Sequence, residues 1–285
     1  MDFVSQGRNC NAGAPRKKNR AMVWNPQQYL KFSGHRLRPA VDLLMRIPDF
    51  EVRSVADLGA GAGNVTRLIG ERWPDAAVVG VEGSAEMVAA GRKAAPEVEW
   101  LQQDLGSWQP AQKYDLIYSN AALHWLPHHA GLFPSLMEKV EPGGILAVQM
   151  PRNFGAPSHL LIAETALNGP WRSQLEHLVT PPPVHEPGFY HDLLAPKSDN
   201  VDIWETEYLQ VLEGDNPVKE WTKGTWLRDI WMSCKVRIKR RSRRPTASAW
   251  QKPIRAMRRG RRCFRSGGCS WWRSARHRGR IRPWS

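Results

Sequence analysis

Cysteine is scarce in this chain of 285 residues, and its four cysteines lie toward the two ends. None occurs between residues 11 and 233, which excludes a disulfide framework and a thiolate metal site from most of the chain. The sequence has no run of about 18 apolar residues, so we expect no membrane-spanning helix. Its beginning lacks the apolar segment of a secretory signal. These absences favour a cytoplasmic protein.

Acidic residues are almost missing from the last part of the chain. The net charge of +14 would by itself suggest a nucleic-acid or membrane partner. Residues 229–285 carry 19 Lys and Arg and one acid, a net charge of +18. Residues 1–228 therefore carry 41 − 19 = 22 basic and 27 − 1 = 26 acidic residues, a net charge of −4. The basicity belongs to the tail, whereas the body is mildly acidic.

The tail, residues 229–285, also lacks leucine, glutamate, tyrosine and asparagine. Too few apolar residues remain to bury a core, so we expect it to be disordered. Its 16 Arg and five Trp are typical of a segment that binds single-stranded nucleic acid. The alternative is an out-of-frame translation of a GC-rich gene, which the abrupt change in composition favours. At the other end, the polar residues 1–21 are expected to form a disordered leader ahead of Met22.

A glycine-rich turn follows a short apolar strand within residues 54–64. Gly59, Gly61 and Gly63 stand at alternate positions, and Asp57 precedes the first of them by two residues. Glycine is required where a backbone passes close to a ligand or adopts a positive φ. A strand, a glycine turn and a helical pattern open a nucleotide-binding βαβ unit. The G-x-G-x-G spacing resembles motif I of the S-adenosylmethionine-dependent methyltransferases.

Two acids end the next two predicted strands. Glu82 ends a strand over 76–81 and lies 82 − 59 = 23 residues after the first glycine, where a carboxylate can accept hydrogen bonds from ribose hydroxyls. Asp104 ends a strand over 98–103, where methyltransferases of this class meet the adenine ring. The carboxyl ends of parallel strands share one edge, so these acids and the glycine turn should enclose one nucleoside. The predicted cofactor-binding residues are Asp57, Gly59, Gly61, Gly63, Glu82, Gly83, Asp104, Leu105 and Asn120.

Strands and helices alternate through the body of the chain. Further strands over 114–119 and 145–150 make five in all, which predicts a doubly wound, mostly parallel sheet of the Rossmann-like α/β class. Residues 152–200 interrupt the alternation and predict a helical cap inserted over the site. Residues 201–211 alternate again and predict a sixth strand.

Six longer stretches carry a closer resemblance: 24–32, 36–44, 57–64, 119–125, 149–154 and 201–208. In these stretches the domain 22–228 resembles the trans-aconitate 2-methyltransferases, small bacterial class I methyltransferases that act on a carboxylate. The resemblance implies S-adenosyl-L-methionine as methyl donor and a small polycarboxylic acid, trans-aconitate above all, as substrate. We expect a monomer. The family continues beyond residue 228 with a helix and an antiparallel strand, and neither pattern occurs here, so the last strand is expected to be missing.

Such a reaction needs little catalytic apparatus. A carboxylate with a pKa near 4 is already deprotonated at pH 7, so neither a general base nor a metal is predicted. The protein has to position two reactants and exclude water, while basic groups hold the carboxylates that do not react. The predicted substrate-binding residues are Trp24, Tyr29, Arg36, Arg38, His124, Trp125 and Asn153. A solvated helix face remains the alternative for the basic residues before the first strand.

Two other functions stay open. The tail could make the chain a nucleic-acid-binding protein or a nucleic-acid methyltransferase, although residues 119–122 lack the Asn/Asp-Pro-Pro-Tyr/Phe pattern of amino-methylating enzymes. The chain could also be an inactive, truncated remnant. In that case the apolar edge of the fifth strand would have no partner, which predicts poor solubility.

Overall fold

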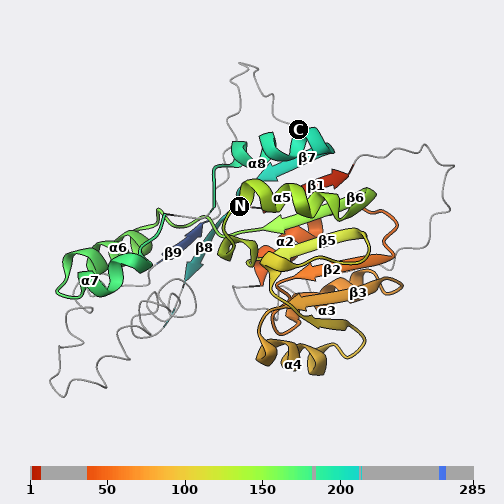
Figure 1. Ribbon diagram of the computed structural model, residues 1–285, viewed down its shortest axis with the longest axis horizontal. Coiled ribbons are helices and arrows are strands. Elements are labelled where there is room, and N and C mark those ends of the chain that lie inside the picture. Colours follow the sequence, from red (N-terminus) through yellow and green to blue (C-terminus); the bar gives the residue numbers. More distant parts are fainter. Residues whose placement is uncertain (1, 8–36, 182–183, 212, 214–262, 268–285) are drawn as a thin grey trace, which may run out of the picture.

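The computed structural model describes residues 2–7, 37–181, 184–211, 213 and 263–267. Its centre is a seven-stranded sheet in the order β4-β3-β2-β5-β6-β1-β7 (Figure 1). The strands are β1 (Asp2–Gly7), β2 (Ser54–Leu58), β3 (Ala77–Glu82), β4 (Glu99–Gln102), β5 (Tyr114–Asn120), β6 (Val140–Gln149) and β7 (Ser198–Trp204). The five strands from β4 to β6 are parallel, which confirms the predicted doubly wound, Rossmann-like fold.

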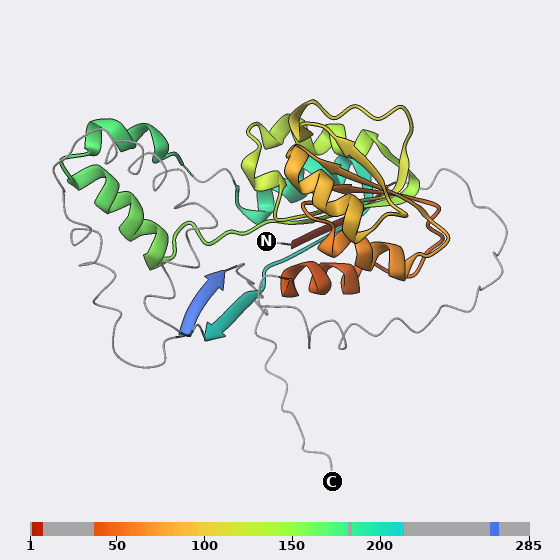
Figure 2. The same ribbon diagram turned by 90° about the horizontal axis from the view of Figure 1, so that it is seen from below.

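Helices cover both faces of this sheet (Figures 1 and 2). One core contains side chains of α2 (Arg38–Arg46), α3 (Asn64–Arg72) and α4 (Ala85–Ala94), and the other those of α5 (His129–Glu138) and α8 (Pro187–Leu194). Successive strand side chains point to opposite faces. In β6, Leu146 and Val148 therefore belong to the α5–α8 core, whereas Ile145 and Ala147 belong to the other. All four are fully buried, as expected for a sheet covered on both sides.

The start of β6 differs from the sequence prediction. Residues up to Val140 have helical spacing, but α5 ends at Glu138 and Val140 already pairs with Tyr114 of β5. The register then shifts between Tyr114 and Leu116, which accommodates the Pro-Gly-Gly sequence within the strand. A Cβ on Gly144 would lie 2.6 Å from the Asp115 carbonyl oxygen, so only glycine fits at this close approach.

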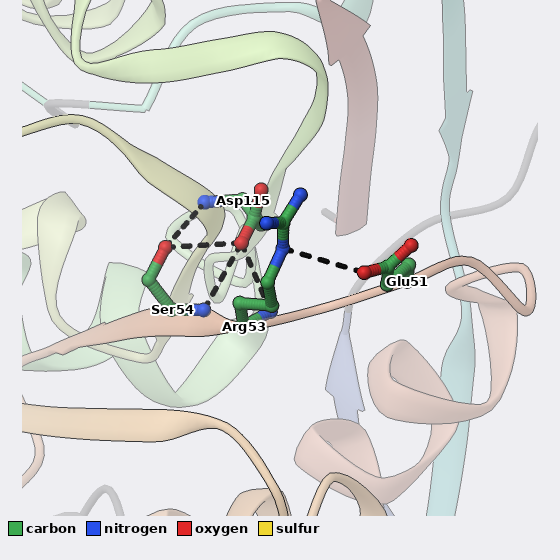
Figure 3. A network of polar contacts seen from close by, with 4 residues as sticks. All are labelled: Glu51, Arg53, Ser54 and Asp115. Atoms are coloured by element: carbon green, nitrogen blue, oxygen red, sulfur yellow. Dashed lines mark hydrogen bonds and ion pairs between the residues drawn. The ribbon is translucent and has the colours of Figure 1, made fainter. Parts of the chain in front are cut away.

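Asp115 fastens the amino end of β5 to that of β2 (Figure 3). Its Oδ2 accepts hydrogen bonds from the backbone N–H groups of Arg53 (2.9 Å) and Ser54 (3.0 Å) and from the Ser54 hydroxyl (3.1 Å). Arg53 also lies 3.4 Å from Glu51 in an exposed ion pair. Because this network lies at the amino ends of the parallel strands, it fixes their register on the edge opposite the glycine turn.

The first residues of the chain are part of the sheet. Residues 2–7, predicted to begin a disordered leader over 1–21, form β1, which is antiparallel to both β6 and β7. Phe3 lies opposite Val148 on one side and Ile203 on the other. The edge of the fifth parallel strand, predicted to lack a partner, therefore has one, since the beginning of the chain supplies it. Residues 8–21 lie outside the described residues.

Residues 152–200, predicted to form a cap, contain two groups of elements. Helix α6 (Pro157–Asn168), helix α7 (Arg172–Leu175) and the 3-10 turn η3 (Glu176–Leu178) lie together (Figures 1 and 2) and pack around a small core of their own. Helix α8, the turn η4 (Ala195–Lys197) and β7 belong to the main domain instead. Within the described part of the chain, no helix has the length and apolarity needed to cross a membrane.

The predicted sixth strand over 201–211 is two strands. It is broken between β7 and β8 (Glu207–Val211), and β8 pairs with β9 (Cys263–Gly267) in a separate two-stranded sheet. Strand β9 is the described part of the tail that was predicted to be disordered. Residues 214–262 and 268–285 lie outside the described residues.

Candidate cofactor and substrate site

The three glycines of the turn after β2 all have a positive φ, of 78°, 57° and 85° for Gly59, Gly61 and Gly63. Their surroundings differ. A Cβ on Gly59 would lie 2.2 Å from the Ala122 Cβ, and one on Gly63 would lie 3.1 Å from the Trp100 ring. Among the described residues, no atom lies within 4 Å of the position of a Cβ on Gly61. Gly61 is therefore the position where the turn faces open space that a ligand can enter.

Glu82, at the tip of β3, is bonded to this turn. Its Oε2 accepts a hydrogen bond from the Gly61 N–H (3.0 Å), and its Oε1 accepts one from the Ser84 N–H (2.9 Å). A carboxylate has about four lone-pair sites, so two remain for further donors. Ser84 also caps α4, because its hydroxyl accepts a hydrogen bond from the Met87 N–H.

The end of β4 lies beside Glu82. The Gln103 N–H donates to the Glu82 carbonyl oxygen (3.0 Å), and the Asp104 carboxylate accepts from the Gly106 N–H (2.9 Å), which caps the turn η1 (Leu105–Ser107). Leu105 Cδ1 lies 3.6 Å from the position of a Cβ on Gly59. The structure thus brings together the glycine turn and both strand-end acids at one edge of the sheet. Gly83 is exposed at this same edge.

Asp57 is enclosed by protein, with 2% of its surface exposed. Its Oδ2 accepts a hydrogen bond from the Thr66 hydroxyl (2.6 Å), which joins β2 to α3 beneath the turn. Burial raises the pKa of Asp57 to about 7, and the charge of Glu82 acts in the same direction. The observed contacts of Asp57 therefore hold the glycine turn against α3.

Asn120 ends β5 next to the turn. Its Oδ1 is buried and has no hydrogen-bond partner among the described residues. Ala121, which follows, has φ of 52°, a conformation that costs a non-glycine residue free energy and that tends to occur at functional sites. A buried amide oxygen without a donor is uncommon in a native protein, so this atom favours a ligand that supplies one.

The 3-10 turn η2 (Leu123–Trp125) places His124 and Trp125 just after Asn120. The His124 ring is buried, and its Nδ1 has no partner among the described residues. Burial, followed by the influence of His129, lowers the pKa of His124 to about 4. His124 is therefore neutral at pH 7 and can contact a carboxylate only as a hydrogen-bond donor. The Trp125 ring, 56% exposed, lies with its centroid 4.6 Å from that of His124.

Arg38 stands at the start of α2 and is largely exposed. Its Nε lies 3.8 Å from Asp42 Oδ2, and its guanidinium lies over the Tyr208 ring at 5.2 Å from the centroid. Asn153 lies half-buried in the connection from β6 to α6, where its carbonyl oxygen accepts from the Ala156 N–H. No described interaction joins Arg38 or Asn153 to His124. The other predicted substrate-binding residues, Trp24, Tyr29 and Arg36, lie outside the described residues.

Arg152 was not predicted from the sequence, although it links the segment after β6 to the start of α8 and to the end of β7. Its Nε lies 2.6 Å from Glu205 Oε1, and its Nη1 lies 2.7 Å from Glu186 Oε1. Glu205 is 3% exposed and lies at the break between β7 and β8. A sequence signal existed, because Glu205 follows Val201 and Ile203 at the spacing of the buried face of a strand.

Comparison with known proteins decides the family. Residues 55–144 match the family model of a methyltransferase domain. The trans-aconitate 2-methyltransferase of Azoarcus sp. (strain BH72) is 49% identical over 206 residues, which cover 72% of this chain and 81% of that protein. The chain belongs to the trans-aconitate 2-methyltransferase family. The enzyme of that name from Streptomyces avermitilis is 44% identical over 216 residues, 73% of this chain and 80% of that protein.

Solved structures are more distant from this member of the family. The S-adenosylmethionine-dependent methyltransferase from Mesorhizobium loti is 21% identical, with a TM-score of 0.44, over 69% of this chain and 93% of that chain. The assignment rests on the sequence relatives and the domain match, and these do not favour the nucleic-acid alternative. S-adenosylmethionine is the methyl donor. The Glu82 carboxylate fits it, as do Gly61 and the Asn120 oxygen, which have no neighbour or hydrogen-bond partner there among the described residues.

Proposed function

We propose that this protein methylates one carboxylate of trans-aconitate, forming a methyl ester. The identity of 49% over 206 residues with a trans-aconitate 2-methyltransferase carries this proposal. The convergence of the glycine turn, Glu82 and Asn120 at one sheet edge supports it. When bound, S-adenosylmethionine supplies an electrophilic methyl group on a sulfonium.

The donor side of the proposed site is the edge of the sheet at the glycine turn. Glu82 uses its remaining lone pairs to accept hydrogen bonds from the two ribose hydroxyls, while the Gly61 N–H holds the carboxylate in place. The buried Asn120 oxygen accepts a hydrogen bond from the amino-acid part of the donor. Asp104 and Leu105 lie where the adenine ring is expected.

The acceptor side lies at the turn η2. His124 offers a neutral ring whose Nδ1 has no partner in the described part of the chain, and Trp125 offers an exposed aromatic ring. Arg38 supplies positive charge from α2, although Asp42 competes for it. Because a carboxylate attacks without a general base, these groups act by holding the carboxylates that do not react. Trp24, Tyr29, Arg36 and Asn153 complete the proposed set.

Calorimetric titration with S-adenosylhomocysteine tests the donor half, and a methyl-ester assay against trans-aconitate and saturated tricarboxylates tests the acceptor half. We expect binding of the nucleoside and ester formation with trans-aconitate. Glu82→Gln should weaken nucleoside binding about tenfold, since it removes charge-assisted hydrogen bonds. Nucleoside binding without any ester would refute trans-aconitate as substrate, and absence of both would support the inactive-remnant alternative.

Arg38→Ala tests the anchor directly. The KM for trans-aconitate should rise several-fold while the affinity for S-adenosylhomocysteine stays unchanged. Arg46→Ala on the same helix is the matched control, because Arg46 pairs with the exposed Asp202 (3.8 Å) at the other end of α2. Equal KM values for trans-aconitate in the two variants would contradict a role of Arg38 in holding the substrate. A monomeric state and a cytoplasmic location stay predictions.

A further inference from the structure

A buried chain of hydrogen bonds reaches the turn η2 from α8. The ring of His129, the first residue of α5, has its Nε2 3.1 Å from the Leu123 carbonyl oxygen and its Nδ1 2.6 Å from the Tyr190 hydroxyl. The Tyr190 hydroxyl also accepts a hydrogen bond from the His185 backbone N–H (3.1 Å). His129 and Tyr190 are 2% and 1% exposed, so this chain is shielded from water.

One arrangement of hydrogens satisfies every group in this chain. The Leu123 carbonyl can only accept, so the His129 Nε2 must carry the hydrogen. The His185 N–H can only donate, so the Tyr190 oxygen accepts it and gives its own hydrogen to His129 Nδ1. Burial lowers the pKa of His129 and raises the pKa of Tyr190 to about 12, so both stay neutral at pH 7. The direction of each bond is thereby fixed.

The chain joins the turn η2, which the proposed function takes as the acceptor side, to the segment before α8. At one end, the His129 ring is bonded to the backbone of η2, which carries His124 and Trp125. At the other end, His185 belongs to the segment that returns from the cap to α8. That return is also held by Arg152, which pairs with Glu186. A shift of the return segment would therefore be transmitted to η2 through Tyr190 and His129.

We propose that His129 and Tyr190 are positioning residues for the methyl acceptor, which fix the orientation of His124 and Trp125 and couple it to the return segment of the cap. This inference rests on the proposed function, because it takes η2 as the acceptor side. Simple core packing is the competing explanation, since Phe133 lies edge-on to both rings, with centroids 5.3 Å from His129 and 4.8 Å from Tyr190. The two explanations differ in what the Tyr190 hydroxyl does.

Tyr190→Phe, made in the full-length chain, distinguishes the positioning role from core packing, because it keeps the ring and removes only the hydroxyl. We expect the KM for trans-aconitate to rise about fivefold, with the KM for S-adenosylmethionine and the affinity for S-adenosylhomocysteine unchanged. The matched control is Tyr114→Phe. Tyr114 is also buried, at 4% exposed, but it lies at the amino end of β5, away from η2.

A second measurement does not depend on the substrate. In ¹⁵N-labelled protein, the ring resonances of His124 and the indole resonance of Trp125 should shift in Tyr190→Phe and stay in place in Tyr114→Phe. If the wild type forms no ester, the proposed function fails, and these resonances still decide the positioning role. If Tyr190→Phe does not fold, the same measurements on His129→Gln decide. Unmoved resonances, or an unchanged KM for an accepted substrate, overturn the inference.

Discussion

At the scale of single residues, the G-x-G-x-G pattern combines two physical requirements. All three glycines need a positive φ, but Gly59 is also pressed against Ala122 of the loop after β5. At Gly61, no described residue lies within 4 Å of the position of a Cβ. Gly59 therefore allows two loops to pack closely, whereas Gly61 leaves room for the methyl donor S-adenosylmethionine.

Alanine substitutions should separate these requirements. Gly59→Ala should lower the free energy of unfolding by about 3 kcal/mol or more, since it combines a clash with a left-handed backbone. Gly61→Ala should cost about 1 kcal/mol, from the backbone alone. Its loss of affinity for S-adenosylhomocysteine should nevertheless exceed tenfold. Chemical denaturation and calorimetry measure the two effects. Equal stability losses with equal affinities would contradict the division of roles.

His124 should make stability depend on pH. Its pKa of about 4 in the folded protein lies below the value of 6.5 expected when unfolded. Between these values the unfolded chain binds a proton that the folded chain does not, so stability falls as the pH drops from 6.5 toward 4. The wild type should lose on the order of 3 kcal/mol relative to His124→Gln across this window. Unfolding curves of both proteins at several pH values measure the difference, and parallel pH profiles would contradict it.

At the scale of elements, the strands whose positions depend on local sequence patterns were predicted well. Strands β2 to β5 carry their own apolar spacing, and they and the glycine turn are found where predicted. The start of β6 and the break before β8 depend on partners distant in sequence. Val140 becomes a strand residue because Tyr114 lies beside it, and the strand breaks where Glu205 meets Arg152. No local pattern contains those contacts.

The Arg152 pairs should be unequal in energy. Glu205 is buried, whereas the side chain of Glu186 is 77% exposed. Glu205→Gln should lower the free energy of unfolding by about 2–3 kcal/mol, because it removes the charge that offsets a largely buried guanidinium. Glu186→Gln should cost less than about 1 kcal/mol, as exposed pairs usually do. Urea denaturation of both variants tests this, and equal costs would show that burial of Glu205 does not matter.

At the scale of the whole molecule, β1 completes the sheet. It lies between β6 and β7, which do not pair with each other. The sequence could not indicate this, since residues 2–7 precede a polar stretch and their partners are more than a hundred residues away. The candidate site shows the same division. The cofactor side of the site was predictable from the glycine turn, Glu82 and Asp104, which lie close together in the sequence. The hydrogen bond between His129 and Tyr190 depends instead on how α5 and α8 pack.

A proline substitution in β1 tests how much this strand contributes to the stability of the sheet. Ser5 pairs with Leu146 on one side and Val201 on the other, and proline removes its N–H from this interior strand. Ser5→Pro should lower the free energy of unfolding by at least about 3 kcal/mol or reduce the yield of soluble protein. Ser5→Ala keeps the N–H and should be close to wild type. A proline variant as stable as the alanine variant would mean that β1 contributes little.

The position of β1 has a consequence for the order in which the chain folds during synthesis. Asp2 is translated long before its partners Gln149 and Trp204. The parallel strands β2 to β6 can assemble beforehand, whereas β1 must wait until β7 has emerged. Residues 2–7 are thus translated before the parallel strands but pair after them, and until then the edge of β6 stays open to chaperones and to neighbouring chains.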